Sequence, residues 1–275
     1  MLSIFYCESN IAVAAAVSAA TAIISIVMVV LMNKLFKENQ VSLIITTAVC
    51  FACAFVATLF CYNLIVLAGY IISVVCTGIG LTKLCGVMHK NTIYNLSPLH
   101  RFAKFIIPVS VFFEMFRPFF IDCNNKDDVN YYSVWSAFGL RCHTETVGKY
   151  ATVVSSRGIC AYDVNWEDIN ITSIITLILF AVVLIMQGLI IWRQFVDPDN
   201  ARDWADAGIL VTCIGAMFVY GMFSSNNFGV TKYSVEHTSL AVFVIVLLGA
   251  LNRVLYFAKV EEYLDKLSGK LIKKA

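Results

Sequence analysis

The chain has 275 residues, of which 60% are apolar and 14% are charged, with a mean hydropathy of +0.80 and a formal net charge of +2. A soluble domain carries about 25% charged residues, so this chain has too few polar groups to cover a surface exposed to water. The nearly neutral charge gives no basis for nucleic-acid binding. We therefore expect an all-α polytopic membrane protein whose solvent is a lipid bilayer.

Apolar runs of spanning length predict about seven transmembrane helices, because about 20 apolar residues cross the hydrocarbon core of a bilayer. The run Val41–Met88 is long enough for about 72 Å of helix, so it must contain two spans, with a break at Cys61, Tyr62 and Asn63. Small residues in the first span predict close packing inside the bundle. The predicted spans are Ile11–Met32, Val41–Phe60, Leu64–Leu84, Phe102–Ile121, Ile169–Trp192, Ala205–Phe223 and Ser239–Phe257.

These spans divide the chain into four regions. Residues 1–121 hold the first four helices, residues 122–168 form a polar extracytosolic loop, and residues 169–257 hold the last three helices. Residues 258–275 form a basic amphipathic helix on the cytosolic side. With the N-terminus outside and the C-terminus inside, fourteen of the 20 Lys and Arg residues are cytosolic and five lie outside. The positive-inside rule favours this orientation.

The extracytosolic loop is predicted to be stapled by disulfides. Cys7, Cys123, Cys142 and Cys160 all lie outside in this topology, and four cysteines allow three pairings. Two short β-like runs, Tyr150–Val154 and Ile159–Val164, flank a turn sequence and predict a β-hairpin. A Cys142–Cys160 bond suits that hairpin and leaves Cys123 for Cys7. Disulfides on the outer side favour the plasma membrane or an endomembrane.

The same loop carries an aromatic cluster made of Tyr131, Tyr132, Trp135 and Phe138. Such side chains fill a small core, sit at the membrane interface, or bind a partner. The four residues either pack in a core or at the membrane interface, or they form a partner-binding surface, for which they are the candidates.

Two groups within the spans could carry chemistry. Glu114 and Arg117 are spaced i, i+3 in the fourth span, and ionisable residues at membrane depth often mark a pathway or a buried pair. They could instead snorkel to the outer interface. Cys50 and Cys53 form a C-x-x-C within the second span, a spacing also found in membrane thiol oxidoreductases. The alternative is that both are small, buried apolar residues.

No complete catalytic motif is present, and the histidines have no spacing typical of a metal or haem site. No cofactor or metal is expected. The sequence therefore favours a non-enzymatic membrane protein that acts through assembly, as a channel-forming or scaffold subunit. It would form homo- or hetero-oligomers through its transmembrane helices and its outer loop. The first alternative is an ion or small-solute transporter that uses Glu114 and Arg117. The second is a thiol oxidoreductase that uses Cys50 and Cys53.

Overall fold

The computed structural model places most of the apolar helices and parts of the segments between them. The residues that it describes are 11–36, 39–59, 64–89, 98–116, 120–125, 128–132, 142–145, 171–197, 208, 237–238, 247–248, 250–251, 254–255 and 258–272.

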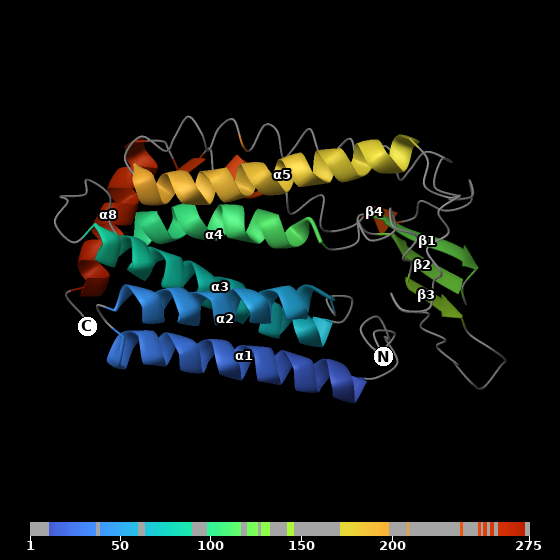
Figure 1. The fold of residues 1–275 in the computed structure, drawn as a ribbon, viewed down its shortest axis with the longest axis horizontal. Helices are drawn as coiled ribbons and strands as arrows, with labels where there is room; N and C mark the ends of the chain where they lie inside the picture. The colour runs from blue at the N-terminus through green and yellow to red at the C-terminus, as the bar shows by residue number, and fades with distance from the viewer. Residues whose placement is uncertain are drawn as a thin grey trace.

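The described helices that belong to the bundle run in alternating directions, side by side (Figure 1). Four of them are long and apolar enough to cross a membrane, which confirms the first, second, third and fifth predicted spans as helices and is compatible with an integral multi-pass membrane protein. These four helices are α1 (Ile11–Lys34), α2 (Gln40–Leu59), α3 (Leu64–Met88) and α5 (Ile171–Val196).

The fourth predicted span differs from the sequence-based expectation. Helix α4 is Pro98–Glu114, so it begins before Phe102 and does not continue to Ile121. A β-strand already starts at Phe120, inside the predicted span. Hydropathy could not locate this end, because the apolar residues continue past it. Pro118 does give a local reason, since a proline disfavours the helical conformation at the residue before it.

The remaining predicted elements are described only in part. The sixth span and the hairpin predicted at residues 150–164 lie outside the described residues, apart from the helical Gly208. In the seventh span, residues 247–248, 250–251 and 254–255 are described and are helical. The C-terminal helix α8 (Ala258–Ile272) lies within the predicted region 258–275.

A small antiparallel sheet lies at one end of the bundle, and α8 lies at the other (Figure 1). We call these the sheet end and the α8 end. The sheet has the order β3-β2-β1-β4, so β4 reaches β1 from a distant part of the chain. Its strands are β1 (Phe120–Asn125), β2 (Asp128–Tyr132), β3 (Cys142–Glu145) and β4 (His237–Thr238).

Small residues bring α1 and α3 into close contact. The Ser18 hydroxyl accepts a hydrogen bond of 3.1 Å from the Gly69 amide, and the Ser25 hydroxyl donates to the Ser73 hydroxyl at 3.0 Å. A Cβ atom on Gly69 would lie 2.6 Å from the Ser18 carbonyl oxygen, so only glycine fits there. Small residues with interhelical hydrogen bonds are how helices associate in lipid, where no hydrophobic force draws them together.

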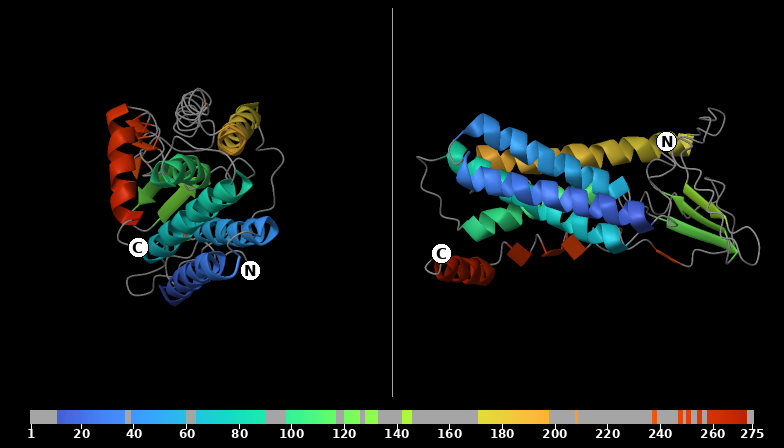
Figure 2. Two further views of the ribbon diagram at one scale, coloured as in Figure 1. Left: turned by 90° about the vertical axis from the view of Figure 1, so that its left-hand side faces the viewer. Right: turned by 90° about the horizontal axis from the view of Figure 1, so that it is seen from below.

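The first span does not pack inside the bundle as predicted. Helix α1 lies at the edge of the described helices (Figure 2), and its contacts are with α2 and α3. Its buried small residues Ser18, Thr21 and Ser25 lie against α3, whereas several large apolar side chains are exposed: Ile23, Ile24, Ile26, Val27 and Val30. The small residues thus predicted a close contact correctly, but composition could not show that only one face makes it.

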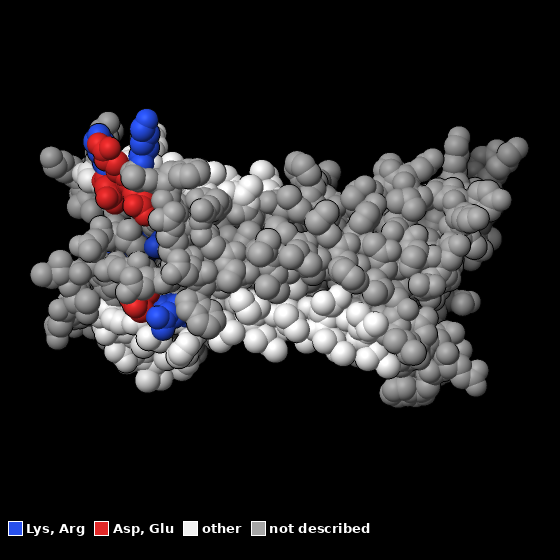
Figure 3. All heavy atoms as spheres, turned by 90° about the horizontal axis from the view of Figure 1, so that it is seen from above, with Lys and Arg blue, Asp and Glu red and all other residues white. Residues whose placement is uncertain are grey.

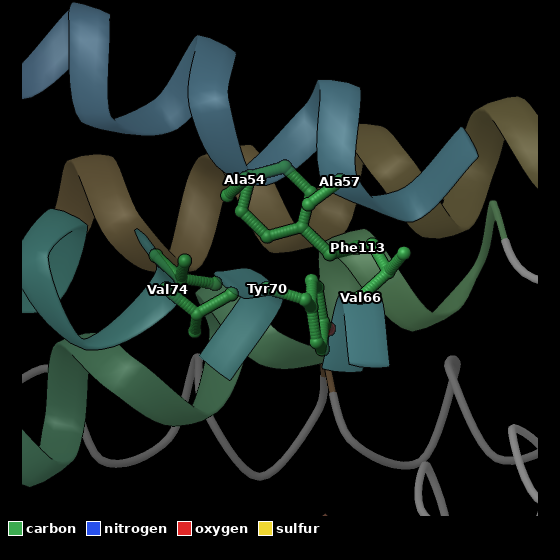
Figure 4. Packing of buried hydrophobic residues seen from close by; sticks show 7 residues of the cluster. Ala54, Ala57, Val66, Tyr70, Val74 and Phe113 are labelled. Atoms are coloured by element: carbon green, nitrogen blue, oxygen red, sulfur yellow. The ribbon is translucent and has the colours of Figure 1, made fainter. Parts of the chain in front are cut away.

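The apolar core between α2, α3 and α4 is built around Phe113. Figure 4 shows its ring beside Ala54 and Ala57 of α2, where the small side chains leave room for it. On α3, Val66 and Tyr70 complete the same cluster. Phe113 and Ala54 are fully buried, so α4 is tightly held within the bundle although it is shorter than a spanning helix.

Helix α8 runs across the axis of the bundle instead of along it (Figure 2). It packs against α4 at the α8 end. A helix that lies transverse to the spans runs parallel to the membrane plane if those spans cross a bilayer.

The contact at Gly69 gives a stability prediction. In Gly69→Ala, the new methyl group would overlap backbone atoms of Ser18, which cannot move aside as a flexible side chain can. We expect a loss of about 1–3 kcal/mol in the free energy of unfolding, measured by titration with a denaturing detergent and followed by circular dichroism. Gly188→Ala in α5 is the matched control, because a Cβ atom there meets nothing within 4 Å. Equal effects of the two substitutions would contradict the close α1–α3 contact.

Candidate functional site

The most unusual polar group in the bundle is the carboxyl group of Glu114, the last residue of α4. Its side chain is only 3% exposed, and it accepts a hydrogen bond of 3.0 Å from the hydroxyl group of Tyr70 on α3. Tyr70 is itself 5% exposed. An ionisable group in such a place is costly to bury and is retained only where neighbouring groups hydrogen-bond to it.

Aromatic side chains pack beside Tyr70. The Phe113 ring lies edge-on to Tyr70, with ring centroids 6.3 Å apart, and Phe51 of α2 packs on Phe113 at 4.7 Å. Phe112 lies beside both phenylalanines. These rings give Tyr70 an apolar environment and hold it in place. A hydrogen bond in such an apolar environment is electrostatically stronger than one in water.

Glu114 also stands apart from the other charged groups. On the face shown in Figure 3, the described charged side chains gather at the α8 end. The same holds along the chain: Lys34 ends α1, Lys83 lies near the end of α3, and Arg193 lies near the end of α5, all at that end. Among the charged residues whose side chains the structure describes, Glu114 alone lies away from the α8 end.

The predicted Glu114–Arg117 pair is only half described. Helix α4 ends at Glu114, so the shared helix face that the i, i+3 spacing predicted is not described. Arg117 lies outside the described residues, so the pair stays a prediction. The partner that the structure does give to Glu114 is Tyr70, which sequence reasoning missed. A tyrosine in an apolar span offers a hydroxyl donor, but nothing local indicates which residue it will reach.

Cys50 and Cys53 lie in the middle of α2 and are buried. The Cys50 thiol lies 3.8 Å from the carbonyl oxygen of Ser25, and Cys76 of α3 belongs to the same apolar cluster. Both cysteines of the C-x-x-C are free thiols. This burial is typical of cysteines that pack as small apolar residues. The thiol oxidoreductase hypothesis therefore gains no support from the position of these two residues, and it stays a prediction.

The aromatic cluster predicted in the outer loop is described only in part. Tyr131 and Tyr132 are consecutive residues of β2. Trp135 and Phe138 lie outside the described residues. The cluster therefore stays a prediction.

The register of the sheet constrains the cysteines. Cys142 of β3 pairs with Tyr131, which pairs with Ile121, whereas Cys123 lies two residues further along β1. The two cysteines are thus two strands and two residues apart, or about 12 Å, whereas a disulfide needs about 4.4–6.8 Å between Cα atoms. A bond between Cys123 and Cys142 is excluded by this register. Cys7 and Cys160 lie outside the described residues.

The first hairpin of the sheet was also missed, although the sequence contains a signal for it. The run Asn124 to Asp128 is rich in Asn and Asp, which favour turns, and only two residues separate Asn125 from its partner Asp128. The first two residues of β1, Phe120 and Ile121, were assigned to the end of a span because they are apolar. Among the described side chains, no group of three or more His, Cys, Asp or Glu residues could hold a metal ion.

Comparison with known proteins gives no relative for this chain. No protein family, curated protein or solved structure matches it. The part of the chain that the structure describes forms a helical bundle with four helices of spanning length, a small sheet at one end and a transverse helix at the other.

The register predicts which disulfides the native protein cannot contain. Proteolysis of the unreduced protein with its free thiols blocked, followed by mass spectrometry, should show no peptide that links Cys123 to Cys142. Any bond made by either residue should lead to a cysteine outside the sheet. The reduced and alkylated protein provides the control digest. A Cys123–Cys142 peptide from the monomeric protein would show that the register of β1, β2 and β3 is wrong.

Proposed function

We propose that this chain is a non-enzymatic multi-pass membrane protein that acts through assembly, as a scaffold or channel-forming subunit of a larger membrane complex. The observation that carries the proposal is the two-sided character of α1. One face binds α3 through Ser18 and Ser25, and the other presents exposed, mostly β-branched side chains. In a bilayer such a face meets either lipid or a helix of another subunit.

The position of α1 supports the second of these. It stands at the edge of the described bundle (Figure 2). Among the described helices, α1 packs mainly against α2 and α3. Branched side chains such as Val27 and Val30 have few rotamers in a helix, so they lose little entropy when another helix packs on them. The apolar face of α1 is therefore the surface through which we expect subunits to associate.

The proposed orientation has the sheet end outside the cytosol and the α8 end inside it. The start of α1 lies at the sheet end, whereas α8 lies at the opposite end (Figure 1). The described Lys and Arg residues all lie toward the α8 end, and cytosolic segments are those enriched in Lys and Arg. This distribution supports an N-out, C-in topology in the plasma membrane or an endomembrane.

A second candidate function, an ion pathway, is favoured by the buried Glu114. A carboxyl group held by a phenol hydroxyl within the bundle can bind and release a proton. It would act at the sheet end, because Tyr70 is six residues, or about 9 Å, from the start of α3. Under this candidate, Glu114 and Tyr70 form the proton-binding site, and Arg117 would adjust its charge.

Assembly is tested by the mass of the protein in mild detergent. We expect a mass several times the 30.6 kDa of one chain, measured by native mass spectrometry. Replacing Ile23, Val27 and Val30 of α1 by Ala should shift the protein to smaller species, because it removes apolar surface from the contact.

The matched control for this assembly test carries Ala at Ile178, Val182 and Ile185 of α5. These residues have the same helical spacing and are also exposed. The control should keep the mass of the native assembly. A native protein that runs as a single chain, or equal effects of the two triple variants, would count against assembly through α1.

The ion-pathway candidate is tested in proteoliposomes that contain a pH-sensitive dye and carry a proton gradient. Glu114→Gln keeps the shape of the side chain and removes its ability to exchange a proton, so it should abolish any protein-dependent proton flux. Glu262→Gln, at an exposed position of α8, is the control and should leave the flux unchanged. Absence of flux in the native protein, or full flux in Glu114→Gln, would remove this candidate.

A further inference from the structure

The apolar face of α8 is used inside the molecule. Leu264, Leu267 and Ser268 lie on the less exposed side of α8, which packs against α4. On the other side, Tyr263 is exposed, and Glu262 and Lys266 form an exposed ion pair of 2.6 Å. An amphipathic helix often inserts its apolar face into a membrane surface. Here that side is half-buried or buried and α8 packs against α4, so α8 forms a cap on the end of the bundle.

Charged groups meet where α8 covers α4. Helix α4 contributes His100, which is fully buried, and Lys104, which is 3% exposed and one turn further along. Helix α8 contributes Glu261 and Asp265, also one turn apart, and both act electrostatically on His100. A lysine is almost never buried unless opposite charge lies nearby. The two carboxylates of α8 thus bring negative charge close to His100 at this contact.

We propose that α8 is a detachable cap, held on the first turns of α4 by its packing over a buried, uncharged His100, next to Lys104, Glu261 and Asp265, and released in mild acid. The geometry requires His100 to be uncharged in the capped state. It is fully buried and lies one helical turn from the positive charge of Lys104, so a second positive charge there is unfavourable. Detachment exposes His100 to water, where a proton is readily accepted.

The direction of the pH dependence follows from the pKa of His100. Burial first, and then the charge of Lys104, lower this pKa from its ordinary value of 6.5, while Glu261 and Asp265 oppose the change. The capped state therefore binds fewer protons than the detached state. The stability of the cap is fully present above about pH 6.5 and is lost as the pH falls below 6.5 toward the lowered pKa.

The cap is tested by hydrogen exchange of the full-length protein in lipid nanodiscs, followed by mass spectrometry of peptides from α8. Labelling times are scaled for the slower intrinsic exchange in acid. Between about pH 7.5 and pH 5.5, the opening of α8 should increase about tenfold, the change that one group with an exposed pKa of 6.5 produces when its buried form does not titrate. Exchange of α1 should not change with it.

Two variants show whether His100 is responsible. His100→Gln keeps a polar side chain of similar size but cannot titrate, so α8 should open equally at both pH values. Glu262→Gln removes the exposed ion pair on the outer side of α8 and should keep the tenfold response. Equal protection of α8 at the two pH values in the native protein would overturn the proposal, whether or not the variants fold. So would a full response in His100→Gln.

Discussion

The close approach of α1 to α3 is the constraint on which the rest of the bundle depends. In a bilayer, apolar surface gains nothing by leaving lipid for another apolar surface, so helices need close packing and hydrogen bonds to associate. Gly69 allows the two backbones to meet, and the hydroxyl groups of Ser18 and Ser25 then bond across the interface. Because α3 is fixed in this way, its Tyr70 reaches Glu114, and the alanines of α2 pack in the same core cluster as Tyr70.

The two ends of the bundle bury polar groups by different means. Toward the sheet end, one buried carboxyl group accepts a hydrogen bond from a phenol hydroxyl whose own ring packs against Phe113. At the α8 end, His100 and Lys104 are covered by a transverse helix that brings carboxylates. The first arrangement is rigid, since it lies within packed helices. The second depends on a surface helix and on the protonation of one histidine, so it responds to the surrounding solution.

Hydropathy predicted the helices of spanning length well, because length and apolar content are the properties that a bilayer selects. The break at Cys61 to Asn63 was placed between α2 and α3, where the two helices are separated. The same signal was wrong at Phe102–Ile121, since Phe120 and Ile121 are apolar in a strand as they would be in a span. Glu114 was chosen as a candidate from its charge alone, but its hydrogen bond with Tyr70 was not predicted. Partners across helices depend on packing, which a single sequence does not encode locally.

The pairing of β4 with β1 has a consequence for the order in which the protein is made. Chains emerge and fold from the N-terminus, so α1 to α4 and the first three strands are complete before His237 and Thr238 exist. Until those residues arrive, the outer edge of β1 lacks the partner that it has in the finished sheet. An exposed strand edge readily pairs with another chain. The edge of β1 thus stays unpaired while more than 100 further residues are made, until β4 pairs with it.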